Sequence, residues 1–141
     1  MYNTSSMEVT TEQICQDVMS LLGRFKQEVA MAAEKRHLTP VQMAALYMVD
    51  RHGELPMGKV AHVLHCDPSN VTGIVDRLVG RKLVTREECP TDRRAKTISL
   101  TPEGKKVVDE MTTLLPAQLG CDKLTSEERS TLHSALQKIL V

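Results

Sequence analysis

Residues 67–100 read DPSNVTGIVDRLVGRKLVTREECPTDRRAKTISL, and this stretch decides the fold. Its first half predicts an amphipathic helix, because apolar side chains recur at the i, i+3, i+4 and i+7 spacing of one helix face. The apolar face consists of Val71, Ile74, Val75 and Leu78, and the opposite face carries Ser69, Thr72, Gly73, Asp76, Arg77 and Gly80. The second half predicts a β-hairpin, with strands over residues 84–88 and 95–100 and the tip at Pro90-Thr91-Asp92-Arg93-Arg94.

This pair of elements is suited to double-stranded DNA. A helix with short hydrogen-bonding side chains can enter the major groove, and an arginine-bearing hairpin beside it can enter the minor groove. Gly73 favours this interpretation over an ordinary solvent-exposed face, because glycine inside a helix costs about 1 kcal/mol relative to alanine. The charge distribution agrees, since residues 57–106 hold 10 Lys and Arg against 6 Asp and Glu, whereas the whole chain holds 18 of each.

Helices are predicted on both sides of this stretch. Apolar residues keep helical spacing over about residues 8–36, and shorter helices are expected over 57–65 and 124–141. Three helix starts combine a polar N-cap with proline at the first helical position: Thr39-Pro40, Asp67-Pro68 and Thr101-Pro102. The predicted class is mostly α with a small β-hairpin wing, in one domain over residues 1–141. A winged helix-turn-helix core, about 38–101, is flanked by dimerisation helices at about 8–36 and 102–141.

The flanking helices indicate a homodimer. Both carry apolar stripes that the winged core does not need, so their best burial is against a second copy of the chain. The longest stretch without Asp, Glu, Lys or Arg, residues 37–49, is too short to span a bilayer. The first seven residues lack the features of a secretory signal. We therefore expect a cytoplasmic protein without a membrane partner.

Four segments of the chain resemble the MarR family of bacterial transcription regulators, named for multiple antibiotic resistance. They are residues 38–42 (LTPVQ), residues 70–78 (NVTGIVDRL), residues 92–94 (DRR) and residues 100–104 (LTPEG). The resemblance implies a homodimer formed by the terminal helices, which binds a pseudo-palindromic DNA operator. Such regulators usually repress, and a small ligand or oxidation releases them from the operator.

The resemblance also implies roles for individual residues. Ser69, Asn70, Thr72, Gly73 and Arg77 would face the major groove or its flanking phosphates, and Arg93 and Arg94 would be the wing's DNA-binding residues. Asp92 would brace Arg94, and fixing this arginine beforehand reduces the side-chain entropy lost on binding. The chain departs from the family at Lys82, where glycine is usual. A left-handed residue there would cost roughly 1 kcal/mol without glycine, so Gly80 is expected to end the helix early.

A catalytic role is not expected, and no cofactor is implied. Residues 53–60 (GELPMGKV) nearly match the phosphate-binding pattern G-x-x-x-x-G-K-[ST]. Val60 lacks the hydroxyl that this pattern uses for magnesium, and the preceding segment is predicted to be helical where a strand is required. The alternative function is therefore of another class: a winged-helix module that binds a protein and has no sequence-specific DNA binding.

Two weaker hypotheses concern metal and redox chemistry. His62, His65 and Cys66 have a helical spacing that could hold a transition metal, but polar residues near DNA phosphates explain them equally well. Cys15 lies in the first helix, where some peroxide-sensing relatives keep a reactive thiol, and a buried inert thiol is the alternative. The four cysteines are too widely spread to suggest a disulfide framework.

The family's usual ligand crevice lies between the dimerisation helices and the winged core. Aromatic residues make up 2% of the chain, so an aromatic cage is excluded. Eight methionines would suit an adaptable apolar lining for a small hydrophobic effector, although ordinary core packing also accounts for them.

Overall fold

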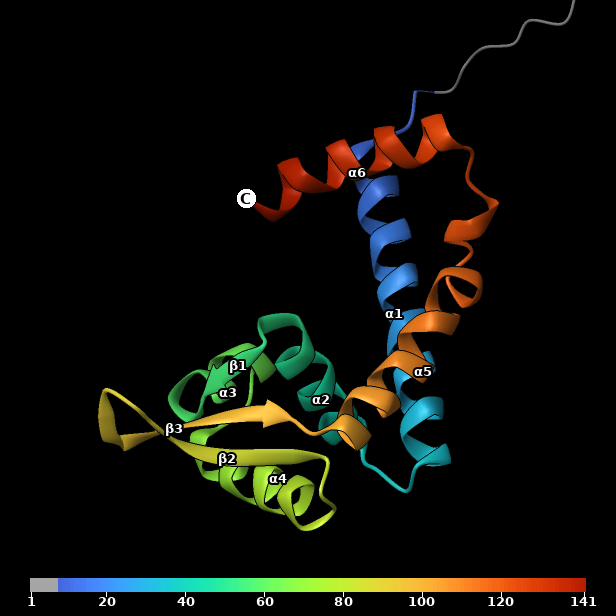
Figure 1. The fold of residues 1–141 in the computed structure, drawn as a ribbon. Helices are drawn as coiled ribbons and strands as arrows, with labels where there is room; N and C mark the ends of the chain where they lie inside the picture. Colours follow the sequence, from blue (N-terminus) through green and yellow to red (C-terminus); the bar gives the residue numbers. More distant parts are fainter. Residues whose placement is uncertain (1–7) are drawn as a thin grey trace, which may run out of the picture.

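The structure is a computed structural model that describes residues 8–141, apart from the side chains of Arg93 and Arg94. Its elements are shown in Figure 1. The helices are α1 (Thr11–Lys35), α2 (Pro40–His52), α3 (Met57–Leu64), α4 (Pro68–Gly80), α5 (Pro102–Gln118) and α6 (Ser126–Leu140), with a 3-10 turn, η1 (Cys121–Lys123). The strands are β1 (Glu54–Pro56), β2 (Val84–Cys89) and β3 (Asp92–Leu100). The predicted helices and hairpin are therefore confirmed, and β1 is an addition to them.

The helix starts follow the predicted caps. Thr39 and Thr125 form capping boxes with Gln42 and Glu128. Each threonine hydroxyl accepts a hydrogen bond from the partner's backbone N–H, and each partner side-chain oxygen accepts one from the threonine's backbone N–H. Thr101 accepts a bond from the backbone N–H of Gly104 at 3.0 Å. Asp67 occupies the N-cap position of α4, but its carboxylate makes no capping bond. The start of α4 therefore depends on its proline and not on a side-chain cap.

Three helices end in the same left-handed turn without glycine. His37, His65 and Lys82 have φ angles of 54°, 52° and 58°. At the end of α4, the N–H of Lys82 donates to the carbonyl of Val79 and the N–H of Leu83 to that of Leu78, at 2.9 and 3.0 Å. This is the Schellman arrangement, and the residue after it, Leu83, is buried. The helix does end at Gly80, as expected, but the expectation that Lys82 thereby avoids the left-handed conformation is wrong, since Lys82 adopts it directly before the buried Leu83.

The sheet has three antiparallel strands in the order β1-β3-β2. Strand β1 was not predicted, because it is three residues long, contains a proline and gives almost no periodic signal. In β1, Leu55 pairs with Ile98 of β3, and both side chains are buried. The hairpin tip is also tighter than predicted, because the strands reach Cys89 and Asp92. The backbones of Arg93 and Arg94 therefore belong to β3 and not to the tip.

The hydrophobic core lies in the winged part of the molecule. Its largest fully buried side chains come from helices α2, α3, α4 and α5 and from both hairpin strands: Met43, Leu46, Val49, Val60, Val75, Leu78, Val84, Ile98 and Val108. In contrast, α6 has no buried residue, and the figures show it at the end of the molecule opposite the winged part. In α1 the buried residues are Val29 and Ala33, both in its C-terminal part.

Over residues 8–141, none of the helices combines the length and the apolar character needed to cross a membrane.

Candidate nucleic-acid interface

The outer face of α4 is the strongest candidate for a binding surface. The helix is anchored from below by Val71, Val75 and Leu78, which are at most 2% exposed. The five residues predicted for this face, Ser69, Asn70, Thr72, Gly73 and Arg77, are all exposed. A Cβ added to Gly73 would meet no heavy atom within 4 Å, so packing within the chain does not require a glycine there. The structure thus leaves room on this face for a partner that approaches closely.

An ion pair joins the wing to α4. Arg86 of β2 donates through Nη2 to the carboxylate of Asp76, which the sequence placed on the outer face of the helix. The side chain of Arg86 is 24% exposed, and its Nε atom is buried without a hydrogen-bond partner. A half-buried guanidinium between two elements fixes their relative position, because its charge must stay paired. The alternation of β2 indicates the side of the strand on which Arg86 lies, but it does not identify Asp76 as the partner, so this contact was not predicted.

At the wing tip, the thiol of Cys89 lies 3.2 Å from the hydroxyl of Thr91. Hydrogen bonds from the side chain and backbone of Thr91 lower the pKa of the Cys89 thiol below its ordinary value. Asp92, which begins β3, is exposed. The side chains of Arg93 and Arg94 lie outside the described residues, so their DNA contacts and the bracing role of Asp92 stay predictions.

The proposed metal ligands lie near one another but are not placed to bind one ion. His65 takes the left-handed conformation after α3, which breaks the helical spacing on which the hypothesis rested. The ring centroids of His62 and His65 are 6.5 Å apart. Together with Cys66 and Asn70, these histidines line an open hollow between α3 and α4. Within residues 8–141, no group of three His, Cys, Asp or Glu side chains is placed to hold a metal ion.

The segment that resembles a phosphate-binding loop has the wrong surroundings. It follows helix α2 and runs through β1 into α3, whereas the phosphate-binding motif leads from a strand into a helix. Val60, which replaces the required hydroxyl residue, is 1% exposed and belongs to the core. Both objections from the sequence are therefore confirmed.

A crevice lies between α1, α2 and α5. Its volume is about 110 Å³. The apolar part of its lining includes Met31, Met43 and Met111 together with Ala32, Val107 and Leu114. Its charged lining consists of Glu28, Lys35, Arg36 and Glu110, and the last two form an ion pair. Three of the eight methionines thus line a small crevice at the junction of the long helix and the winged part.

The cysteines are free thiols in the structure. Cys15 and Cys121 are exposed, and Cys66 and Cys89 are half-buried. Cys15 is therefore not buried within one chain, and its role as an oxidant sensor stays a prediction.

The chain is similar to several known proteins. The MarR family model matches residues 38–96. The HTH-type transcriptional repressor MdtR of Bacillus subtilis is 30% identical over 106 residues, which cover 72% of this chain and 68% of that protein. The structure of RV1404 from Mycobacterium tuberculosis has a TM-score of 0.71 at 27% identity and covers 94% of both chains. A mutant of MepR from S. aureus, bound to an oligodeoxyribonucleotide, has a TM-score of 0.63 at 25% identity, with 94% of this chain and 97% of that chain covered.

Proposed function

This chain belongs to the MarR family. From this premise we propose that it is a homodimeric transcription regulator that represses the genes it controls, because its relative MdtR is named a transcriptional repressor. The observation that carries the proposal is the outer face of α4. Serine, asparagine, threonine and arginine side chains project from a helix whose other face is locked into the core. Side chains of these types bind base edges and phosphates in the major groove.

The rest of the molecule supports a symmetric dimer on DNA. Large apolar residues of the terminal helices stay exposed in one chain, among them Ile14, Val18, Leu22, Leu132 and Ile139. A second copy would cover them around a two-fold axis and present two α4 helices to one duplex. Two such helices contact half-sites about 34–36 Å apart, which corresponds to one turn of DNA. The proposed operator is therefore pseudo-palindromic.

The crevice between α1, α2 and α5 is the proposed effector site. Its methionine-rich lining would suit a small hydrophobic molecule, and its position next to the winged part gives an occupant access to the DNA-binding elements. Oxidation of Cys15 is the other proposed route of release from DNA. A regulator of this kind works where the bacterial chromosome is, so we place it in the cytoplasm. We assign it no catalytic activity.

A protein interaction module is the alternative from another class. The salt dependence of binding distinguishes the two functions. DNA binding releases counterions, so its affinity falls steeply as the salt concentration rises, whereas the affinity of a largely apolar protein contact does not.

The proposal is tested by selecting bound sequences from a random duplex library with the purified protein. We expect enrichment of a palindrome and a steep loss of affinity for it with increasing salt. Thr72→Ala should lose about 0.5–1.5 kcal/mol of discrimination at one base position, the net contribution of one hydrogen bond. Thr131→Ala, the same change on α6, is the control and should bind like the wild type. Failure to enrich any sequence, with the protein folded, would favour the protein interaction module.

A further inference from the structure

The C-terminal end of α4 is attached to the end of α1 by one side chain. Arg81, the C-cap residue of α4, donates from Nη1 to the carbonyl of His37 and from Nη2 to the carbonyl of Arg36, both at 2.7 Å. Arg36 is the C-cap of α1, and His37 is the left-handed residue after it. The arginine therefore uses two parallel donors on two successive carbonyls, a geometry that lysine cannot reproduce.

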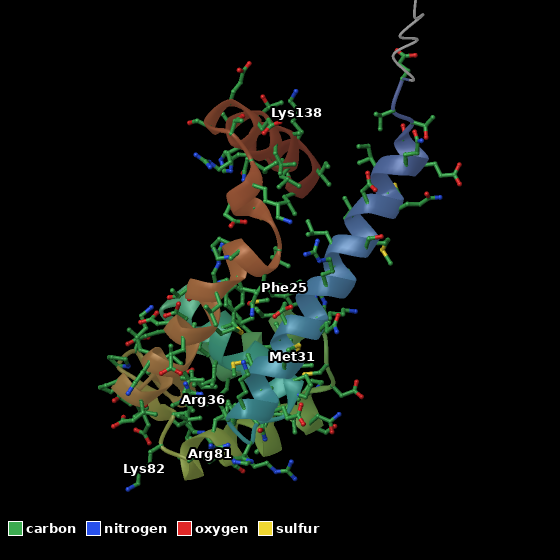
Figure 2. The ribbon with its side chains drawn as sticks, turned by 90° about the vertical axis from the view of Figure 1, so that its right-hand side faces the viewer. Phe25, Met31, Arg36, Arg81, Lys82 and Lys138 are labelled. Atoms are coloured by element: carbon green, nitrogen blue, oxygen red, sulfur yellow. The ribbon has the colours of Figure 1, made fainter. Side chains whose placement is uncertain are left out.

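The electrostatics of this contact are favourable for both helices. The last carbonyls of a helix lack partners within it, and its C-terminus carries a partial negative charge. Arg81 places a positive charge where the C-terminal ends of α1 and α4 approach each other. Figure 2 shows Arg36 and Arg81 at the same end of the molecule, with Met31 of the crevice above them. The contact thus lies between the crevice and the DNA-facing helix.

The same end of α4 is attached to the start of α5. The hydroxyl of Thr101 donates to the carbonyl of Lys82 at 2.6 Å, and the N–H of Thr101 donates to the carbonyl of Leu83 at 3.1 Å. Gly104 lies against the Leu83 carbonyl so closely that an added Cβ would be 2.0 Å from its oxygen. This junction therefore has little freedom to slide.

An ion pair in the crevice completes a closed ring of contacts. The guanidinium of Arg36 pairs with Glu110 of α5, and both residues line the crevice. The ring runs from Arg81 of α4 to the end of α1, through the Arg36–Glu110 pair to α5, and back through Thr101 to the end of α4. Arg36 takes part twice, with its carbonyl toward Arg81 and its side chain toward the crevice.

We propose that Arg81 is a positioning residue for the DNA-contacting face of α4, and that the Arg36–Glu110 pair couples this positioning to the crevice. The inference rests on the proposed DNA binding. Arg81 holds the helix at the angle at which its outer face meets the major groove. An occupant of the crevice that separates Arg36 from Glu110 opens the ring, so that the end of α1 can shift relative to α5 and change the angle at which Arg81 holds α4.

The first test compares Arg81→Lys and Arg81→Gln with Lys82→Gln, which removes one positive charge from the neighbouring residue. Arg81→Lys keeps the charge but loses the paired donors, so affinity for the selected duplex should fall about tenfold. The dependence of log affinity on log salt should keep its wild-type slope. Wild-type affinity would overturn the proposal, and so would a slope smaller by about 0.9, which indicates a lost phosphate contact. Arg81→Gln should weaken binding more than Lys82→Gln does.

The second test concerns the coupling. Glu110→Gln should weaken DNA binding about threefold in the wild-type background and have almost no further effect in Arg81→Gln, because both changes open one ring. Glu103→Gln, the same change on the same helix outside the ring, is the control and should have no effect in either background. Equal losses from Glu110→Gln in both backgrounds would show that the two residues act independently.

A readout without DNA separates this inference from the proposed function. In Arg81→Gln, the amides of Lys82, Leu83 and Leu38 should exchange with solvent faster than in the wild type, while those of α6 should not change. Unchanged exchange at the end of α4 would contradict the positioning role even if the protein binds DNA. Faster exchange in a protein that selects no duplex would instead refute the proposed function alone.

Discussion

The winged core and the terminal helices of this chain differ in how much of their apolar side-chain surface is buried within one chain. In the winged core, Leu46 and Leu78 are at most 1% exposed within a single chain. In α6, Leu140 and Ile139 remain 76% and 62% exposed, and none of the helix's residues is buried. The same types of side chain are therefore covered in one region and bare in the other.

The two regions therefore depend on different contacts for their stability. Burial of apolar surface is the main favourable contribution to folding, so the core can be stable within one chain. The terminal helices have good caps but little burial, and caps alone contribute only about 1 kcal/mol each. Their stability must come from association with a second copy, and it should therefore depend on protein concentration.

The largest expected effect comes from making the same change in both regions. Leu46→Ala should lower the free energy of unfolding by about 2–5 kcal/mol at every protein concentration, because it leaves a cavity in a packed core. Leu140→Ala should lower it by well under half as much. Urea denaturation at two protein concentrations measures both. Equal decreases in the free energy of unfolding in the two variants would contradict the claim that only the winged core is packed within one chain.

The next effect concerns association alone. Leu132→Asp places a charge on the exposed apolar face of α6 and should weaken the dimer about 100-fold, because an unpaired charge would be buried in the interface. Sedimentation equilibrium gives the dissociation constant. Gln137→Glu, at an exposed position of the same helix, is the matched control because it also adds one negative charge. A dimer as stable as the wild type in Leu132→Asp would mean that α6 does not form the interface.

A smaller effect concerns the left-handed backbone at the end of α4. Lys82→Gly should raise the free energy of unfolding by up to about 1 kcal/mol, because glycine adopts the left-handed conformation without steric cost. Lys35→Gly, in the helical last turn of α1, should instead destabilise by a similar amount. Thermal melts compare the two. A loss of stability in Lys82→Gly would show that the lysine side chain makes a contact that outweighs the backbone strain.

The smallest effect is a pH dependence in the terminal region. Hydrogen bonds from the backbone and side chain of Thr125 lower the pKa of Glu128, so the ionised form is favoured in the folded state. This contribution is complete above the ordinary pKa of a glutamate and is lost as the pH falls through the lowered folded value. Glu128→Gln retains a capping side chain but does not titrate. The acid-induced decrease in melting temperature should be slightly smaller in that variant than in the wild type.

Much of the fold was predictable because the signals were local. Proline after a polar cap marked the starts of α2, α4 and α5, and the i, i+3, i+4 pattern identified the buried face of α4. In contrast, β1 has only three residues, and its pairing with β3 depends on a contact between Leu55 and Ile98 that is distant in sequence.

The surface of α4 was also predictable, whereas the contacts that position it were not. The exposed face follows from helical periodicity. The Arg81 bonds to residues 36 and 37 span 45 and 44 positions in the sequence, respectively, and the Arg86–Asp76 pair depends on how a strand crosses a helix. Local patterns can indicate which face such a side chain lies on, but the partner that it contacts is set by the tertiary packing.

The mass of the complex between the full chain and its selected duplex tests most directly whether the chain binds DNA as a dimer. Sedimentation velocity should show a dimer of the free protein and two chains on each duplex, and Leu132→Asp should weaken both. In the complex, the bound protein should protect two half-sites one helical turn apart from nuclease cleavage. A monomer that binds the duplex as one chain, with the terminal apolar faces still exposed, would contradict the claim that this chain reads DNA as a symmetric pair.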